Sequence, residues 1–348
     1  MKTTVVTTTI RVPTFLTAYY ENAKRFGHEV DFVVAGDLKS DPNTQAFCDK
    51  IPNCMYLGPY EQKSYIKDSP LETLLWNSPG RRNVAMFWAY AHGADVIITL
   101  DDDNLATAAD AIGKHTSAIG DHNLLYMYKA KTGWFNVCYI LQERNNVEFY
   151  HRGYPPGQRW KDDWVDIEYP DGKKRVVVNA GLWTGDPDTD AITRLERPLN
   201  VSGFKSEHPD KVVLAAGTWS PFNCQNTALA REIIPAYFLN PMIGRHDDIF
   251  AGYVINRLAE HFGHVIAFGS PLAFHDRSPH NLWKDLDQER TGMQLTDSFV
   301  AVLRGMKLTA KTYHEGYGQI IEGLYDWATN HDMENFIMFM RNWHEVFK

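Results

Sequence analysis

Three consecutive aspartates at the end of an apolar run constrain this chain more than any other feature of its sequence. Residues 96–100, Val-Ile-Ile-Thr-Leu, are typical of a buried strand, and the aspartates at positions 101–103 follow at once. The carboxyl ends of strands are where open α/β sheets bind ligands. Three adjacent carboxylates repel one another, so a cation would offset the repulsion. The stretch predicts a metal site that holds a diphosphate. A solvated acidic turn or a helix start is the alternative for the tripeptide alone.

The composition is that of an ordinary globular chain. With 348 residues, 44% of them hydrophobic and 22% charged, the sequence is long enough for one large domain or two. The formal net charge of −8 argues against general binding to nucleic acid, which needs a basic face. The four cysteines have neither metal-ligand nor disulfide spacing. The N-terminal residues lack the apolar core of a secretory signal, and no apolar run is long enough for a membrane span. We therefore expect a cytoplasmic protein, and leave a homo-oligomer open.

Apolar periodicity predicts an α/β fold. Residues 3–10 and 30–35 are expected to form strands, with a helix over residues 15–26 that ends at Gly27. This order predicts a Rossmann-like, mostly parallel sheet flanked by helices. Residues 40–65 and 152–174 are expected to form loops and short elements. Further helices are expected over residues 81–92 and near 247–262, and further strands over residues 124–128, 134–141, 176–178, 212–215 and 265–268.

The pattern changes near residue 282, where aromatic and aliphatic side chains begin to recur at helical intervals. We therefore expect a catalytic domain over residues 1–281 and a C-terminal helical cap over residues 282–348 packed on it.

Several separate motifs follow one another from the N-terminus to about residue 281. They are Thr9-Ile10-Arg11, the three aspartates, Arg152-Gly153-Tyr154-Pro155 with Arg159, Gly181-Leu182-Trp183, Asp186-Pro187-Asp188-Thr189-Asp190-Ala191, Asn226-Thr227-Ala228-Leu229-Ala230-Arg231, Arg245-His246-Asp247-Asp248 and His275. In this order and approximate spacing they resemble the plant reversibly glycosylated polypeptides, a family that includes the UDP-arabinopyranose mutases. The resemblance implies a GT-A fold for residues 1–281 and a metal-dependent enzyme whose substrate is a UDP-sugar.

The resemblance places the nucleotide at the carboxyl edge of the sheet. Thr9 and Arg11 follow the first strand and would meet the uracil or the diphosphate. Asp37 follows the second strand and would hold the base or the ribose, and Asp102 would turn toward the sugar or its ribose. The alternatives for Arg11 and Asp37 are a surface arginine and a turn residue.

The same resemblance predicts the metal ligands. Asp101 and Asp103 would form the DXD motif of the fold and hold the Mn²⁺ or Mg²⁺ that bridges the diphosphate, so Asp101 also contributes to nucleotide binding. His275 stands where many GT-A enzymes place a last metal ligand. The alternative for His275 is a structural role, which is usual for an isolated histidine.

Four residues are predicted to be catalytic. Asp247 and Asp248 begin a helix at the place that faces the sugar in the GT-A pattern, although acids at a helix start are also common caps. In the family, the arginine at the position of Arg152 is reversibly glycosylated, and the one at the position of Arg159 is needed for activity. An electrostatic clamp on the diphosphate is the alternative for both, because a protonated guanidinium is a poor nucleophile.

Two departures from the family pattern bear on the reaction. Trp160-Lys161-Asp162-Asp163 replaces the family's Glu-Gly within a longer loop, and Asn179-Ala180 replaces its Ser-His. We expect a UDP-sugar mutase that interconverts pyranose and furanose forms. The alternative is a glycosyltransferase that moves the sugar to a glycan, protein or nucleobase, with Asp247 or Asp248 as the base. A binding or scaffold protein without turnover is a third reading, against which the retained acids and arginines argue.

Overall fold

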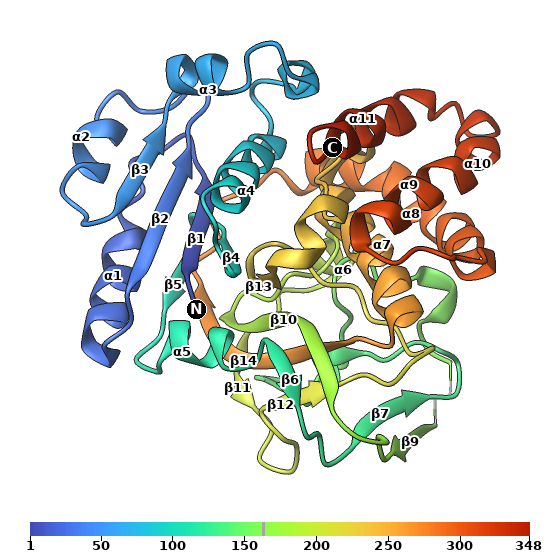
Figure 1. The fold of residues 1–348 in the computed structure, drawn as a ribbon. Helices are drawn as coiled ribbons and strands as arrows, with labels where there is room; N and C mark the ends of the chain where they lie inside the picture. Colours follow the sequence, from blue (N-terminus) through green and yellow to red (C-terminus); the bar gives the residue numbers. More distant parts are fainter. Residues whose placement is uncertain (162–163) are drawn as a thin grey trace.

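A twelve-stranded mixed sheet organises the residues that the computed structural model describes, 1–161 and 164–348 (Figure 1). Its main path runs through β12 (Lys211–Val213), β14 (Val265–His275), β10 (Lys174–Gly185), β13 (Asn226–Ala230), β4 (Val96–Leu100), β1 (Thr3–Thr8), β2 (Val30–Ala35) and β3 (Cys54–Leu57). Four short strands join it: β5 (Asn104–Ala106), β6 (Gly120–His122), β8 (Leu141–Glu143) and β11 (Val201–Phe204). A separate pair is formed by β7 (Met127–Ala130) and β9 (Val165–Glu168).

Parallel pairing aligns the ends of the first strands. β1 pairs in parallel with β2, as in Thr8 with Ala35, and also with β4, as in Val6 with Thr99. β3 continues this parallel set, and β10 and β14 form a second parallel pair. β13 runs in the opposite direction between β4 and β10. The predicted α/β class is confirmed, with a mixed sheet where a mostly parallel one was predicted. The segments after β1, β2 and β4 meet at one edge of the sheet.

Apolar side chains on both faces explain why these strands are buried. Val5 and Ile98 belong to one core cluster, whereas their neighbours Val6 and Ile97 belong to another, as the alternation of a strand requires. The first cluster is covered by α1 (Phe15–Phe26) and α5 (Ala111–Thr116), and the second by α4 (Arg82–Ala91). α1 ends at Gly27, whose φ of 77° is left-handed, as the sequence predicted. The other helices of this part are α2 (Thr44–Cys48), α3 (Pro59–Tyr65), α6 (Ala191–Glu196) and α7 (Asp247–Phe262).

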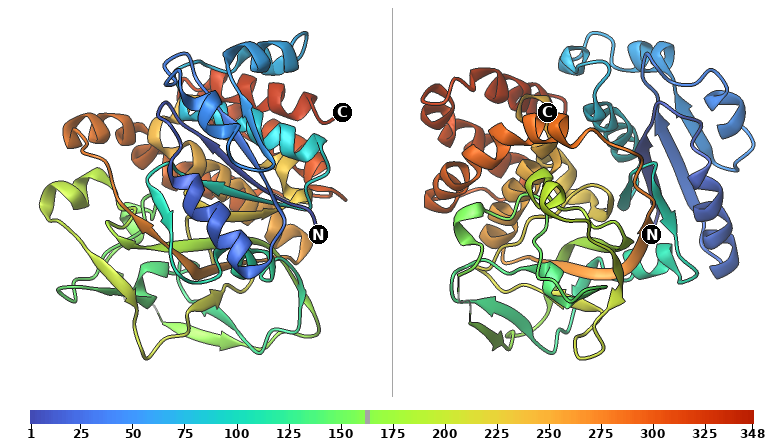
Figure 2. Two further views of the ribbon diagram at one scale, coloured as in Figure 1. Left: turned by 90° about the vertical axis from the view of Figure 1, so that its left-hand side faces the viewer. Right: turned by 180° about the vertical axis from the view of Figure 1, so that it is seen from behind.

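The C-terminal residues form the helical extension that the sequence predicted. It consists of α8 (Leu282–Gly305), α9 (Tyr313–Gly323), α10 (Tyr325–Thr329) and α11 (Glu334–Glu345). These helices contact α7 and the 3₁₀ segments Arg231–Ala236 and Pro241–His246, and Figure 2 shows them grouped away from β1, β2 and β3. The domain boundary at residues 281 and 282 stays a prediction. Among the helices of residues 1–161 and 164–348, none combines the length and the apolar character that a membrane span needs.

Several predicted elements differ in the structure. Residues 134–141 were expected to form a strand, but residues 137–140 form a 3₁₀ helix whose start is capped by Asn136, because its side chain accepts a hydrogen bond from the Cys138 N–H. The strand expected over residues 124–128 begins only at Met127. The strand expected over residues 176–178 is the much longer β10. Within the expected loop of residues 152–174, residues 165–168 form β9, and Asp162 and Asp163 lie outside the described residues.

Candidate functional site

A cleft with a volume of about 450 Å³ lies where β1, β2 and β4 end. Parallel pairing brings these strand ends together, so the segments that follow them can line one cavity. The lining includes six residues predicted from the sequence, which are Thr9, Arg11, Asp37, Asp101, Asp102 and Asp103. Arg82, Ser278 and His280 also line the cleft and were not predicted to be site residues.

Hydrogen bonds fix the wall formed by the end of β1. The Thr9 hydroxyl donates to Asp102 Oδ2 at 2.6 Å and accepts from the Arg11 N–H at 3.0 Å. The Arg11 guanidinium in turn donates to the Ser278 hydroxyl at 2.8 Å, across a sequence separation of 267 residues. Asp102 is therefore held by Thr9, and Arg11 ties the end of β1 to the segment that follows β14.

Asp37 shapes the cleft through the neighbouring loop. Its side chain is buried, and its carboxylate accepts hydrogen bonds from the N–H groups of Asn77 at 2.7 Å and Ser78 at 3.1 Å. Asn77 and Ser78 line the cleft beside it. Asp37 thus positions this loop and also lines the cleft itself, so its predicted contact with the base or the ribose stays a prediction.

Asp103 and His275 form a close pair, because β5 pairs with β14 in a register that places Asn104 opposite His275. His275 Nε2 lies 3.3 Å from Asp103 Oδ2, and its Nδ1 lies 2.5 Å from the Asp186 carbonyl oxygen. A carbonyl only accepts, so Nδ1 carries a proton. Nε2 donates to Asp103 when the ring is protonated, and it offers a lone pair only when the ring is neutral. Burial alone would lower the pKa of His275, but its hydrogen bond to Asp103 and the charge of that carboxylate raise it.

Asp101 has a different partner from Asp103. It accepts a hydrogen bond from Arg82, whose side chain is buried. Burial and the neighbouring Asp103 raise the pKa of Asp101, while Arg82 opposes this rise. Across residues 1–161 and 164–348, no three His, Cys, Asp or Glu side chains gather into a metal-binding group. The predicted ligands are therefore divided between the pair Asp103 and His275 and the ion pair of Asp101 with Arg82.

The pair Asp103 and His275 nevertheless fits a divalent cation. A carboxylate and an imidazole suit Mn²⁺ or Mg²⁺, and the hydrogen bond from Nδ1 to the Asp186 carbonyl orients the ring as ligand histidines require.

Arg82 also connects the cleft to the start of α7. Its guanidinium donates to the Cys224 carbonyl oxygen at 3.0 Å, and the Cys224 N–H donates to Asp248 Oδ2 at 3.2 Å. The position of Cys224 follows from the antiparallel pairing of β13 with β4. This pairing brings Gln225, the next residue after Cys224, to Asp101, and the Asp101 N–H donates to the Gln225 carbonyl oxygen at 3.0 Å. The two groups of acids at residues 101–103 and 247–248 are thus parts of one network.

Arg152 lies between two carboxylates at the buried end of this network. Its Nε lies 2.9 Å from Asp188 Oδ1, and its Nη1 lies 3.0 Å from Asp248 Oδ1. Burial alone would lower the pKa of the guanidinium, but the two carboxylates hold it well above its ordinary value. Asp188 receives a further hydrogen bond from Asn223 at 2.7 Å. Arg152 is therefore charged and engaged on both sides.

Asp247 and Arg159 flank the network. Burial, followed by the charge of Asp248, raises the pKa of Asp247 to about 7. Burial would also raise the pKa of Asp248, but Arg152 lowers it, so the two neighbouring acids differ in protonation near neutral pH. Arg159 donates to Asp190 Oδ2 at 2.5 Å and lies over the Tyr150 ring, 5.5 Å from its centre.

Sequence reasoning missed Arg82, Cys224 and Asp188 as members of this network. For Asp188 the sequence carried a signal, because aspartates alternate over residues 186–190 within one of the family motifs. Arg82 and Cys224 gave no local signal, because their contacts depend on how β4 and β13 align.

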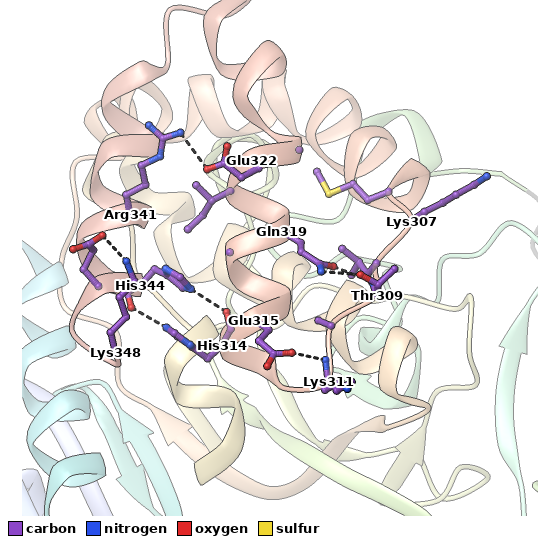
Figure 3. A pocket seen from close by; sticks show the side chains of 17 residues that line it. Lys307, Thr309, Lys311, His314, Glu315, Gln319, Glu322, Arg341, His344 and Lys348 are labelled. Atoms are coloured by element: carbon purple, nitrogen blue, oxygen red, sulfur yellow. Dashed lines mark hydrogen bonds and ion pairs between the residues drawn. The ribbon is translucent and has the colours of Figure 1, made fainter.

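A cavity larger than the cleft lies elsewhere, among the C-terminal helices, with a volume of about 1140 Å³. Several of its polar side chains pair with one another, as Figure 3 shows for Arg341 with Glu322. His314 and His344 stack with ring centres 4.0 Å apart, and each Nε2 lies within 3.2 Å of the other's carbonyl oxygen. None of the predicted site residues lines this cavity.

The family that the motifs indicated is confirmed by a family model. The chain belongs to the reversibly glycosylated polypeptide family, whose model matches residues 82–322. UDP-arabinopyranose mutase 3 of Arabidopsis thaliana is 31% identical over 204 residues, which are 57% of this chain and 51% of that protein. UDP-arabinopyranose mutase 1 of the same plant is 30% identical over 220 residues, 61% of this chain and 56% of that protein. The chain thus spans about half the length of the curated relatives it matches.

Among solved structures, glucosyl-3-phosphoglycerate synthase from Mycobacterium tuberculosis with Mn²⁺ and UDP-glucose aligns with 85% of this chain. The alignment covers 78% of that chain, with 9% identity and a TM-score of 0.46.

Proposed function

We propose that this chain is an enzyme that binds a UDP-sugar in the cleft at the ends of β1, β2 and β4 and interconverts the pyranose and furanose forms of the sugar. The observation that carries the proposal is the gathering of six predicted residues around this one cleft. Membership of the family and the names of the matched plant relatives support this reaction. A cytoplasmic location and self-association are further expectations of the sequence.

Asp103 and His275 would hold Mn²⁺ or Mg²⁺ against the diphosphate. A divalent cation there would neutralise charge on the diphosphate as the sugar leaves. Thr9 would keep Asp102 directed toward the sugar or ribose, because its hydroxyl already holds that carboxylate at 2.6 Å. Arg11, beside them, would add positive charge for the phosphates.

Asp247 would act on the sugar hydroxyls. A carboxyl group with a pKa of about 7 can take up and return a proton at neutral pH, as ring opening and reclosure require. Asp248, kept ionised by Arg152, would bind hydroxyl groups rather than exchange protons.

For Arg152, the geometry favours an electrostatic role over self-glycosylation. Its guanidinium contacts Asp188 and Asp248 and is kept protonated, so it lacks the lone pair that a nucleophile needs. Arg159 would support the same region through its contact with Asp190.

Transfer of the sugar to a separate acceptor is the second candidate. It is favoured by a further cavity that adjoins the cleft and shares Ser278 and His280 with it.

The two candidates are separated by incubating the protein with Mn²⁺ and UDP-arabinopyranose, with UDP-glucose, UDP-galactose and UDP-xylose in parallel. Products are followed by chromatography and the intact protein by mass. A furanose isomer formed without an acceptor would support the mutase. Slow release of UDP that accelerates when an acceptor is added would support the transferase. Asp103→Asn should be inactive in either case, whereas Asp121→Asn, which changes an exposed aspartate paired with Arg175, should be active. Full activity of Asp103→Asn would contradict the proposed site.

A further inference from the structure

We propose that the cavity adjoining the cleft is a subsite for a small molecule that carries a phosphate group, which binds together with the nucleotide sugar. The cavity has a volume of about 320 Å³ and lies between residues 186–199 and residues 277–282. Ser278 and His280 line both this cavity and the cleft, so the two are continuous. The inference rests on the proposed function, because the cleft beside it is taken to hold the UDP-sugar.

Three guanidinium groups line the cavity, whereas Asp186 is the one carboxylate among its described lining residues. The carboxylate that pairs with Arg277 at 2.9 Å belongs to Asp285, which does not line the cavity. Arg197 contacts Glu196, which does not line it either. Asp186 does line the cavity, where it contacts Arg194 and lies 3.9 Å from Arg277 Nε, so one carboxylate faces three guanidinium groups. The N–H donors that these contacts do not use are left to face an anion.

The guanidinium groups are held in place rather than free in solvent. The side chains of Arg194 and Arg277 are only 10% and 9% exposed. Arg194 donates to the Thr189 carbonyl oxygen at 3.1 Å and to the Pro187 carbonyl oxygen at 2.5 Å, in addition to its contact with Asp186. Little side-chain entropy would be lost when a ligand binds to groups that are already ordered.

A buried hydroxyl without a partner is the second, independent observation. Thr189 lines the cavity and is 1% exposed, yet its Oγ1 has no hydrogen-bond partner among the described residues. An unsatisfied buried hydroxyl is costly and uncommon in folded proteins. Its oxygen has less than 1 Å² of accessible surface, so a ligand oxygen in the cavity would satisfy it only once the wall beside it shifts.

A phosphate monoester matches this arrangement better than a neutral or singly charged group. It carries a charge of about −1.5 to −2 and three acceptor oxygens, which suit several guanidinium groups and a hydroxyl. The cavity is next to the proposed metal pair, since Asp186 accepts the hydrogen bond from His275 Nδ1. A bound phosphate ester would therefore lie beside the diphosphate end of the nucleotide sugar.

The test is a calorimetric titration of the whole protein with inorganic phosphate, with and without saturating UDP and Mg²⁺. We expect phosphate to bind in both conditions. Arg197→Gln should weaken the binding about fivefold to tenfold, since it removes one guanidinium contact from a side chain that is 43% exposed. Thr189→Val, which keeps the shape and removes the hydroxyl, should also weaken it, with unfolding temperatures showing that both variants fold.

Arg341→Gln is the matched control, because Arg341 is 47% exposed and also pairs with an exposed glutamate, Glu322. Unchanged phosphate binding in this variant supports the proposal. No phosphate binding, displacement of phosphate by UDP, or an equal loss in Arg341→Gln would overturn it. UDP affinity, measured separately, shows whether the proposed function itself fails.

Discussion

Replacing Asp247 by asparagine should abolish activity and at the same time make the protein more stable at alkaline pH. Asp247 begins α7, and its Oδ1 accepts a hydrogen bond from the Asp248 N–H at 2.9 Å, which an asparagine oxygen can also accept. The substitution therefore mainly removes the charge, which burial and the charge of Asp248 disfavour.

The size of the effect follows from the raised pKa. In the unfolded chain the carboxyl group ionises near its ordinary pKa of 3.8, whereas in the folded protein it keeps its proton up to about pH 7. The unfolded state thus binds fewer protons between these values, and the free energy of unfolding falls as the pH rises through this window. A difference of about three in pKa corresponds to about 4 kcal/mol. Because Asp247 is partly exposed, solvent screening reduces the expected gain to about 2–3 kcal/mol.

Urea unfolding at about pH 4 and about pH 8.5 measures this difference. Asp247→Asn should gain stability at the higher pH and little at the lower one. Asp287→Asn, at an exposed position in α8, is the control and should show no such dependence. A variant that is less stable than the original protein at the higher pH, or that gains equally at both, would refute the reasoning.

Three further predictions follow from contacts in the site. Asp103→Ala should abolish the effect of Mn²⁺ on UDP affinity; equal affinity with and without Mn²⁺ in the unsubstituted protein would contradict the metal assignment. Arg152→Met should lower the free energy of unfolding, measured in urea titrations, by about 3–5 kcal/mol. The substitution leaves the buried carboxylates of Asp188 and Asp248 without their cation. A loss below about 1 kcal/mol would contradict a stabilising role of these ion pairs. Gly153→Ala should lower the unfolding temperature more than Gly172→Ala. Both glycines have left-handed φ angles, of 85° and 78°, but only at Gly153 would a Cβ meet Ile249 Cγ2 at 2.3 Å. Equal losses in unfolding temperature would mean that the left-handed φ angle alone, and not the contact with Ile249, determines the destabilisation.

The parts of the fold that sequence predicted well are those with local signals. α1 and α7 match their expected bounds, since apolar spacing marks their length and Gly27 and Gly263 end them in the left-handed conformation. The aromatic run of residues 134–141 misled the prediction, because a buried strand and a buried 3₁₀ turn need the same apolar side chains. The Asn136 side chain, which accepts a hydrogen bond from the Cys138 N–H, favours the 3₁₀ helix over a strand.

The candidate site could be predicted only in part for a related reason. The residues that follow β1, β2 and β4 lie together because parallel strands end at one edge, which an α/β pattern already implies. The contact of Asp103 with His275 spans distant parts of the chain, and only the family resemblance suggested it. The contact of His275 with Asp103 depends on the register of β5 with β14, and that of Asp101 with Arg82 depends on how α4 packs beside β4. A single sequence reveals neither.

The charges of the site alternate in sign along one row. Asp101, Arg82, Asp248, Arg152 and Asp188 follow one another, each attracted to its neighbours. A single neutralising substitution inside this row leaves an unmatched charge where little water can compensate it. Evolution can therefore alter the row most readily by replacing an arginine and an adjoining aspartate together. In homologous sequences, positions 152 and 188 should accordingly be retained as a pair or exchanged as a pair.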